Sequence, residues 1–401
     1  MGTGLSSERL KKIDLHFQEK YIDTGKLSGA QILVARRGEI AHFSALGKMD
    51  IENDKPTTED TTYRIYSMTK ALTSVALMML YEEGKFQLND PVHKYLPEWE
   101  STEVWVSGEY PDFKTRPQDR PMTIRDLLSH QSGLTYGSND LNSVDRGYQQ
   151  IGWEAMNKMP LPEWSKFIAK MALLFSPGTA WHYSVATDLC GYLVQVISGQ
   201  PFDEFLSERI FEPLGMVDTS FTVTDDKLDR FAACYAPTSD GGMKLQDSPL
   251  SSAYRKKPVW VSGGGGLVST TMDYYRFLQM LANNGKSEDR RYLSRKTIEL
   301  MTANHLPDGR SVFDQAIYPP WNDQLFEGQG WGLGFAIALE HGKTQIAGSP
   351  GQYSWAGVAS TEFWIDPTEE IVVIFMTQLM PSGTYPIKRE LQVLVNAAID
   401  D

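Results

Sequence analysis

Ser67 and Lys70 form the only Ser-x-x-Lys tetrad in the chain, and their side chains could act together as a nucleophile and a base. The tetrad stands where a long helix is predicted to begin, and residues three apart on a helix are surface neighbours. Lys70 could therefore take the proton of the Ser67 hydroxyl as that oxygen attacks a carbonyl carbon. Free backbone N–H groups at a helix start would stabilise the resulting oxyanion. The tetrad thus predicts nucleophilic catalysis by serine.

A motif that fixes only two residues in four also arises by chance. Its significance therefore depends on the helix that follows it. In the alternative interpretation, Ser67 caps a helix and Lys70 is a solvated lysine of its first turn. The segment from Ser67 to Glu83 ends at Gly84, a typical helix stop. Its apolar stripe consists of Met68, Leu72, Val75, Ala76, Met79 and Leu80. This pattern predicts a buried helix whose first turn points into a cleft.

A serine–lysine site usually needs a further proton carrier, and Tyr183 is the candidate. It lies in the segment Trp181-His182-Tyr183-Ser184-Val185, between a loop and a helical pattern that runs from Asp188 to Ile197. The chain has 18 tyrosines, so the residue type alone carries little information. We rely on the position, because a hydroxyl at a junction of loop and helix could reach a cleft.

Other nucleophiles and bases fit less well. Ser349 lies in Ala-Gly-Ser-Pro-Gly, which lacks the first glycine of a nucleophile elbow and is followed by a strand pattern instead of a helix. The seven histidines show no metal-binding spacing, which gives a zinc hydrolase little support. His130 stands where a helix runs into a turn, and there an imidazole usually bonds to backbone. A Ser-His-Asp triad on Ser67 remains open, although Lys70 makes it unnecessary.

Composition bounds the classes of partner. The chain has 401 residues, 41% of them hydrophobic and 22% charged, which is ordinary for an enzyme of two lobes. A net charge of -13 repels phosphate backbones and anionic membranes, so we expect neither nucleic acid nor membrane as a partner. Cys190 and Cys234 form no disulfide framework and are expected to be reduced core thiols.

The chain shows no signal-peptide pattern at its start and no apolar run of membrane-spanning length. We therefore expect a cytoplasmic protein; a signal peptide removed beforehand would leave no trace. The sequence does not fix the oligomeric state, which we expect to be a monomer or a small homo-oligomer.

Sheet patterns lie near both ends of the chain and helical patterns lie between them. An opening helix is predicted around residues 7–23, a hairpin over 31–36 and 39–46, and a last helix over 387–399. Further strands are predicted over residues 344–347, 355–361, 363–365 and 371–377. The middle, about 67–264, reads as helices broken by the long polar loops 101–122 and 135–159, which we expect to be lids or disordered.

A run of glycines follows Ser262, over residues 263–266. It lacks the spacing of a phosphate-binding loop and has no strand just before it. We expect a tight backbone turn beside a cleft.

Three motifs, in this order, carry a family resemblance: Ser67-x-x-Lys70, Tyr183-Ser184 and Trp355-Ala356-Gly357. With them the chain resembles the serine β-lactamase and penicillin-binding protein superfamily, and within it the class C-like family VIII carboxylesterases. The resemblance spans nearly the whole chain. It is supported by the segments 127–134, 264–270, 330–334 and 363–367.

The resemblance implies a role for each matching residue. Ser67 would be the acylated nucleophile, Lys70 its proton acceptor and Tyr183 the group that passes a proton to the leaving group. The backbone N–H groups of Ser67 and Val358 would form the oxyanion hole. Substrate-binding roles fall to Trp355, Ala356, Gly357 and Tyr136, with no metal and no cofactor.

The departures from the family pattern bear on the substrate. Class C β-lactamases carry Lys-Thr-Gly as third motif and Tyr-x-Asn as second, whereas this chain has Trp355-Ala356-Gly357 and Tyr183-Ser184-Val185. Lys343-Thr344-Gln345 is a near match, but Trp355 fits the position of the third motif better. β-Lactams and D-Ala-D-Ala peptides carry a carboxylate that a cation would bind. An indole instead offers an apolar wall to an uncharged group.

We therefore predict an α/β (α+β) fold of β-lactamase type, with an antiparallel sheet flanked by terminal helices and a mostly helical second lobe. The sheet lobe would comprise residues 1–66 and 265–401 and the helical lobe residues 67–264, with the active site in the cleft between them. The predicted activity is a serine carboxylesterase for small-molecule esters of small uncharged acids. The alternatives are a β-lactamase, D-amino-acid peptidase or transesterase, and a non-catalytic ligand-binding or assembly protein of the same fold.

Overall fold

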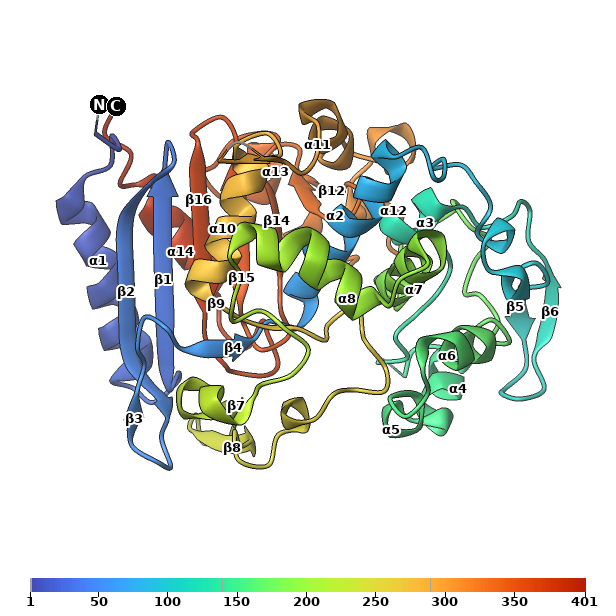
Figure 1. The fold of residues 1–401 in the computed structure, drawn as a ribbon, viewed down its shortest axis with the longest axis horizontal. Helices are drawn as coiled ribbons and strands as arrows, with labels where there is room; N and C mark the ends of the chain where they lie inside the picture. Colours follow the sequence, from blue (N-terminus) through green and yellow to red (C-terminus); the bar gives the residue numbers. More distant parts are fainter. Residues whose placement is uncertain (1, 139, 289) are drawn as a thin grey trace.

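The computed structural model describes residues 2–138, 140–288 and 290–401, and an eight-stranded sheet dominates it (Figure 1). All neighbouring strands are antiparallel, in the order β12-β13-β14-β15-β16-β1-β2-β3. The strands are β1 (Gly29–Arg36), β2 (Glu39–Asp50), β3 (Lys55–Pro56), β12 (Gln329–Trp331), β13 (Ala336–Ala338), β14 (Tyr353–Ala356), β15 (Glu362–Asp366) and β16 (Ile371–Met376). Strands from near both ends of the chain thus share one sheet, as predicted.

Successive side chains of the central strands point to opposite faces of the sheet, and this divides the core into two layers. In β1, Ile32 and Val34 pack with the helices α1 (Ser7–Phe17) and α14 (Ile387–Asn396), whereas Leu33 faces the larger core on the other side. Helix α10 (Thr271–Ala282) lies on that second side, beside β16 (Figure 1). The terminal helices therefore cover one face of the sheet, and the rest of the chain covers the other.

Helix α2 (Thr69–Glu82) lies between the sheet and the helical region and follows a 3-10 turn, Tyr66–Met68 (Figure 1). The apolar-stripe expectation was incomplete here, because every residue from Thr69 to Leu80 is buried. A helix that is covered on all sides needs no polar face. Its buried Thr69 and Thr73 hydroxyls bond to the glycine-containing segment at Leu267 and Gly263, whereas the Ser74 hydroxyl has no hydrogen-bond partner among the described residues. Helix α7 (Ala186–Ser198) packs directly against α2.

The helical region is smaller and contains two segments that were predicted as structureless loops. Residues 103–117 form a hairpin of β5 (Glu103–Ser107) and β6 (Lys114–Pro117), and α4 (Ser143–Ile151) and α5 (Trp153–Met156) lie within 135–159. The expectation of disorder was wrong for these described residues, because apolar anchors such as Val104 and Val144 are buried in the core, and the expectation of lids stays a prediction. The other helices of this region are α3 (Ile124–Leu128), α6 (Leu161–Ile168), α8 (Phe202–Leu206) and α9 (Glu212–Leu214).

The predicted strand at residues 344–347 was also wrong. A helical turn, α13 (His341–Thr344), stands there, and Gln345 follows it with a left-handed φ of 56°. The predicted strand 355–361 ends early, because a turn follows β14 at Gly357. The remaining elements are β4 (Thr62–Arg64) with β9 (Val268–Thr270), β7 (Cys234–Pro237) with β8 (Met243–Asp247), β10 (Lys286–Ser287) with β11 (Arg290–Arg291), α11 (Arg295–Met301) and α12 (Val312–Gln315).

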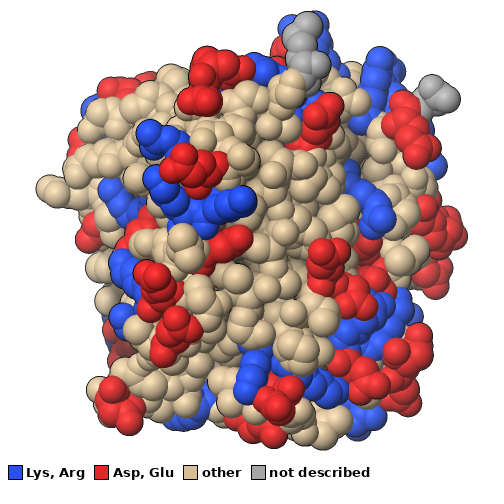
Figure 2. Space-filling view, turned by 90° about the vertical axis from the view of Figure 1, so that its left-hand side faces the viewer, with Lys and Arg blue, Asp and Glu red and all other residues tan. Residues whose placement is uncertain are grey.

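Charges of both signs mix on the face at the α1 and β2 side (Figure 2). Many are paired, as where Arg36 contacts both Glu369 and Asp401. Among the described residues, no helix is long and apolar enough to cross a membrane. Cys190 and Cys234 are buried free thiols, as expected.

Candidate active site

Ser67 lies in the 3-10 turn that leads into α2, and Lys70 lies in the first turn of that helix. The Nζ atom of Lys70 donates a hydrogen bond to Oγ of Ser67 at 3.1 Å. The residue before the serine, Tyr66, has a positive φ of 42°, a conformation that non-glycine residues rarely adopt and that is common at functional sites. The predicted juxtaposition of hydroxyl and amine is therefore present.

Lys70 is fully buried, which excludes the alternative of a solvated lysine. Its Nζ atom also donates to the carbonyl oxygen of Gly264 at 2.6 Å, and it lies 5.2 Å and 4.6 Å from the ring centroids of Tyr136 and Tyr183. Burial lowers the pKa of Lys70 to about 7, and the nearby Asp188 opposes that shift. A substantial fraction of Lys70 is thus neutral near pH 7 and able to accept a proton.

Tyr183 lies in the turn before α7, and its side chain lies beside Ser67 and Lys70. Its phenol oxygen accepts a hydrogen bond from Nε1 of Trp355 at 3.2 Å. Burial raises the pKa of Tyr183, and hydrogen bonds with Ser67, Trp355 and Tyr136 oppose that rise. Tyr183 therefore remains a neutral phenol that can donate and accept protons at the serine.

An aromatic cluster surrounds Tyr183. The ring of Trp355 lies 5.1 Å from it, and the ring of Trp331 lies 4.4 Å from Trp355. Trp321 stacks on Trp355 at 6.0 Å, and His130 lies 4.8 Å from Tyr183. Sequence reasoning missed Trp321, and it assigned no site role to Trp331 although the segment 330–334 supported the family resemblance.

The third motif stands at the end of β14, against the turn that carries the nucleophile. A Cβ atom at Gly357 would lie 2.6 Å from the carbonyl oxygen of Ile65, so only glycine permits this approach. Among the described residues, no hydrogen bond occupies the N–H of Val358, and the residue as a whole is 38% exposed. This position is compatible with the predicted oxyanion hole. The roles of the oxyanion hole and of Ala356 and Gly357 in substrate binding stay predictions.

The competing candidates lie elsewhere. Lys343 is in α13 and pairs with Glu340, outside the sheet. Ser349 stands in the loop before β14, where neighbouring Ala347 accepts a hydrogen bond from Gln392 of α14. His130 contacts the Ser184 hydroxyl through Nδ1, at 3.2 Å, rather than backbone, and its burial holds its pKa well below the usual value. It is a neutral imidazole beneath Tyr183.

The glycine run lies directly beside Lys70. It forms a turn, in which the N–H of Gly266 donates to the carbonyl of Ser262 at 3.1 Å, as predicted. Close approach requires the glycines: a Cβ at Gly263 would lie 2.8 Å from the Thr187 carbonyl oxygen. Sequence reasoning missed the residue that binds this turn, Asp188, which has no motif around it.

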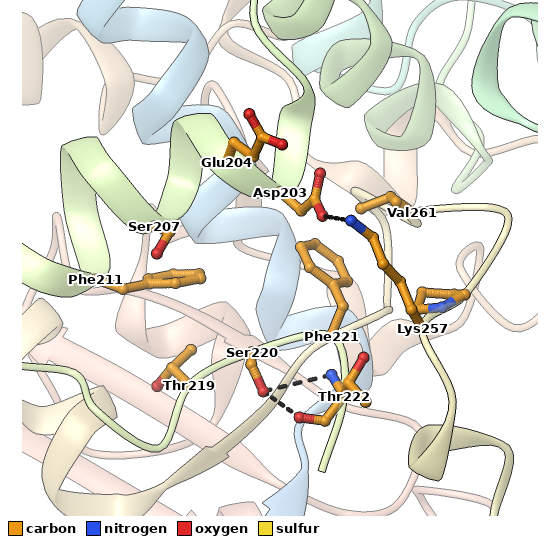
Figure 3. A pocket seen from close by; sticks show the side chains of 11 residues that line it. Asp203, Glu204, Ser207, Phe211, Thr219, Ser220, Phe221, Thr222, Lys257 and Val261 are labelled. Carbon is orange, nitrogen blue, oxygen red and sulfur yellow. Dashed lines mark hydrogen bonds and ion pairs between the residues drawn. The ribbon is translucent and has the colours of Figure 1, made fainter. Parts of the chain in front are cut away.

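A surface pocket of about 300 Å³ lies at a different place, between α8 and the segments 219–222 and 257–261 (Figure 3). Phe211 and Phe221 are among the residues that line it, and Lys257 forms an ion pair with Asp203, which also lines it. None of its lining residues belongs to the group around Ser67.

A serine beside a buried lysine and a tyrosine, between a large antiparallel sheet and a helical region, is the arrangement of a serine hydrolase. The family profile described as Beta-lactamase matches residues 16–397. The chain therefore belongs to the β-lactamase family, and the predicted family membership is confirmed.

Several relatives cover most of the chain. Protein Rv1367c of Mycobacterium tuberculosis is 32% identical over 90% of this chain and 88% of its own length. Esterase EstB of Burkholderia gladioli is 28% identical, covering 89% and 88%. The simvastatin synthase LovD of Aspergillus terreus shares 24% identity with a TM-score of 0.82 over 98% of each chain, which confirms the predicted fold class.

Proposed function

We propose that the protein is a serine carboxylesterase that hydrolyses esters of small uncharged acids through an acyl-enzyme on Ser67. The observation that carries the proposal is the contact between Ser67 and a fully buried Lys70 whose pKa is lowered to about 7. A base of this pKa is matched to proton transfer near neutral pH.

The proposed reaction has two stages, acylation of Ser67 and hydrolysis of the acyl-enzyme. Neutral Lys70 takes the Ser67 proton while Oγ adds to the ester carbonyl carbon and the carbonyl electrons move to oxygen. The N–H groups of Ser67 and Val358 bind that oxyanion. As the C–O bond to the alcohol breaks, Tyr183 passes a proton to the leaving oxygen, drawing on Lys70. Water then attacks the acyl-enzyme by the same steps in reverse, which releases the acid and restores Ser67.

The substrate class rests on Trp355. The third motif offers an indole and no cation, so the carboxylate of a β-lactam would lose its hydration without gaining an ionic partner. The wall formed by Trp355, Trp321 and Trp331 suits an apolar acyl or alcohol group. The names of two relatives agree: Esterase EstB, and Lovastatin esterase of Penicillium rubens at 27% identity over 88% of this chain.

Transfer of the acyl group to an alcohol or amine other than water is a related possibility. The relative Acyltransferase calJ of Penicillium decumbens is 26% identical over 85% of this chain. The chemistry would differ only in the second nucleophile, which Tyr183 and Lys70 would deprotonate in the same way.

A panel of nitrophenyl and alkyl esters of graded acyl length, with nitrocefin included, tests the proposal. We expect turnover of short neutral esters to exceed that of nitrocefin by at least about 100-fold. Intact mass after treatment with a serine-reactive phosphonate, which phosphonylates the nucleophile, should show one adduct that is missing from Ser67→Ala. Absence of both turnover and adduct would favour a non-catalytic binding protein, and nitrocefin turnover equal to the ester rate would favour a β-lactamase.

A further inference from the structure

We propose that Asp188 is a positioning residue that fixes the glycine turn and, through Gly264, orients Lys70 for its reaction with Ser67. The inference rests on the proposed function, since it assigns a residue to the same site. None of the motifs that define the family resemblance contains Asp188.

Asp188 and Lys70 hold the same residue from opposite sides. Oδ1 of Asp188 accepts hydrogen bonds from the N–H of Gly264 at 2.9 Å and from the Ser262 hydroxyl at 2.5 Å. The carbonyl of Gly264 in turn accepts the 2.6 Å hydrogen bond from Lys70. The side chain of Asp188, the residue Gly264 and the Nζ group of Lys70 thus form a continuous chain that ends at Ser67.

The glycine turn is closely packed, so it has little freedom to move if its contact with Asp188 changes. A Cβ atom at Gly264 would lie 2.4 Å from Oδ2 of Asp188 and 2.9 Å from Oη of Tyr136. The Thr73 hydroxyl donates to the neighbouring carbonyl of Gly263 at 2.7 Å, which ties the turn to α2. Asp188 makes the equivalent connection to α7. The carboxylate therefore sets the distance between the turn and the lysine.

The carboxylate also acts on Lys70 through its charge. Asp188 is fully buried, and among the described residues its Oδ2 atom has no hydrogen-bond partner. Its negative charge favours the protonated form of Lys70 and so opposes the lowering of the lysine pKa by burial. Burial raises the pKa of Asp188 itself, and Lys70, Ser262 and the Gly264 N–H oppose that rise.

The other titratable groups around the pair keep their neutral forms near pH 7. Burial raises the pKa values of Tyr136, Tyr183 and Cys190 and lowers that of His130. A change in the pH profile near neutrality therefore reports on Lys70 and Asp188.

Asp188→Asn separates the two effects, because asparagine retains an oxygen acceptor for Gly264 but has no charge. We expect the acid limb of kcat/KM for a neutral ester to move to lower pH by about one unit or more, with the plateau at high pH changed by less than about threefold. Asp188→Ala should show the same displacement and, in addition, a plateau lowered by at least about tenfold.

Ser262→Ala provides a second variant if Asp188 variants fold poorly. It removes one hydrogen bond to the carboxylate, and its acid limb should move in the same direction by a smaller amount. Asp273→Asn is the matched control, since Asp273 is a buried carboxylate of α10 that contacts Thr219 and Asp218 instead. Its acid limb should coincide with that of the wild type.

The inference is overturned if the acid limbs of Asp188→Asn and Ser262→Ala both coincide with that of the wild type. The rate of phosphonate labelling of Ser67 against pH, followed by intact mass, gives a readout that does not need ester turnover. If the labelling profile of Asp188→Asn is displaced from that of the wild type, but the wild type hydrolyses no ester, the proposed function is refuted and the role of Asp188 is retained.

Discussion

The indole N–H of Trp355 donates a hydrogen bond to the phenol oxygen of Tyr183 at 3.2 Å. The third motif of this chain therefore contacts the predicted proton carrier directly, and it does so with a neutral donor. In the proposed mechanism Trp355 would both shape the apolar wall and orient the hydroxyl that protonates the leaving group, which would link substrate choice to proton transfer.

Trp355→Phe keeps an aromatic wall but removes that donor. We expect kcat for an alkyl ester to fall about tenfold, because alkoxide departure needs a well-placed acid. A nitrophenyl ester should be affected less, since nitrophenolate leaves without protonation. Trp105→Phe, which removes an indole donor to Gly108 in the β5–β6 hairpin, is the control. Equal losses on both ester types would argue against the role of the hydrogen bond.

Trp355→Lys restores a cation to the third motif. It should lower KM for nitrocefin several-fold, because the substrate carboxylate gains an ionic partner, and it should weaken turnover of neutral esters. The two effects are measured as kcat and KM for nitrocefin and for a neutral ester, with the wild type and the variant. An unchanged KM for nitrocefin would mean that residue 355 does not contact the carboxylate region.

Ser67→Ala removes the attacking atom. We expect ester kcat/KM to fall by about 10⁴-fold or more and the phosphonate adduct to disappear from the mass spectrum. Ser349→Ala is the control and should change turnover by less than about twofold. Were Ser349→Ala the inactive variant, the nucleophile assignment would be wrong.

Lys70 sets the pH dependence. Its pKa is lowered to about 7, and only the neutral amine accepts a proton. Therefore kcat/KM should fall about tenfold per pH unit below that value and level off above it. Lys70→Arg should be nearly inactive at every pH below 10, because a guanidinium stays protonated. Lys94→Arg, at an exposed ion pair with Asp90, should retain the wild-type profile.

Gly264→Ala tests the close approach of the glycine turn. The added Cβ meets Asp188 and Tyr136, so the turn must shift and Lys70 loses its acceptor. We expect a stability loss of about 1–3 kcal/mol and a fall in kcat/KM of at least about tenfold. Gly342→Ala in α13 meets no atom within 4 Å and serves as the control in thermal unfolding and ester assays. Matching results for the two variants would show that the turn has room.

The contact between Ser67 and Lys70 could be predicted from the sequence because a helix places residues three apart side by side, and their catalytic roles stay predictions. The Lys70–Ser67 hydrogen bond is local in the chain and therefore readable from spacing. Strand periodicity likewise predicted the β1–β2 hairpin and the last strands.

Contacts between distant segments could not be read in this way. Asp188 meets Gly264, 76 residues further along the chain, and nothing in the residues around either one signals the pairing. The β5–β6 hairpin was missed because β5 is short and β6 is polar and ends at a proline. The burial of Val104 and the backbone hydrogen bonds of β5 with Leu173, distant in the chain, hold it in place. The segment 344–347 looked like a strand, but no partner strand is available where α13 places it.

The pairing of β1 with β16 has a consequence for folding. Ile32 pairs with Phe375, near the opposite end of the chain, so the wholly buried strand β1 has an open edge until β16 has been made. During synthesis, helix α2 and the helical region leave the ribosome before β16, and the apolar edge of β1 stays unpaired until then. An unpaired edge of this kind is a template for association with other chains. Refolding yield should therefore decrease with rising protein concentration, and dilution should restore it.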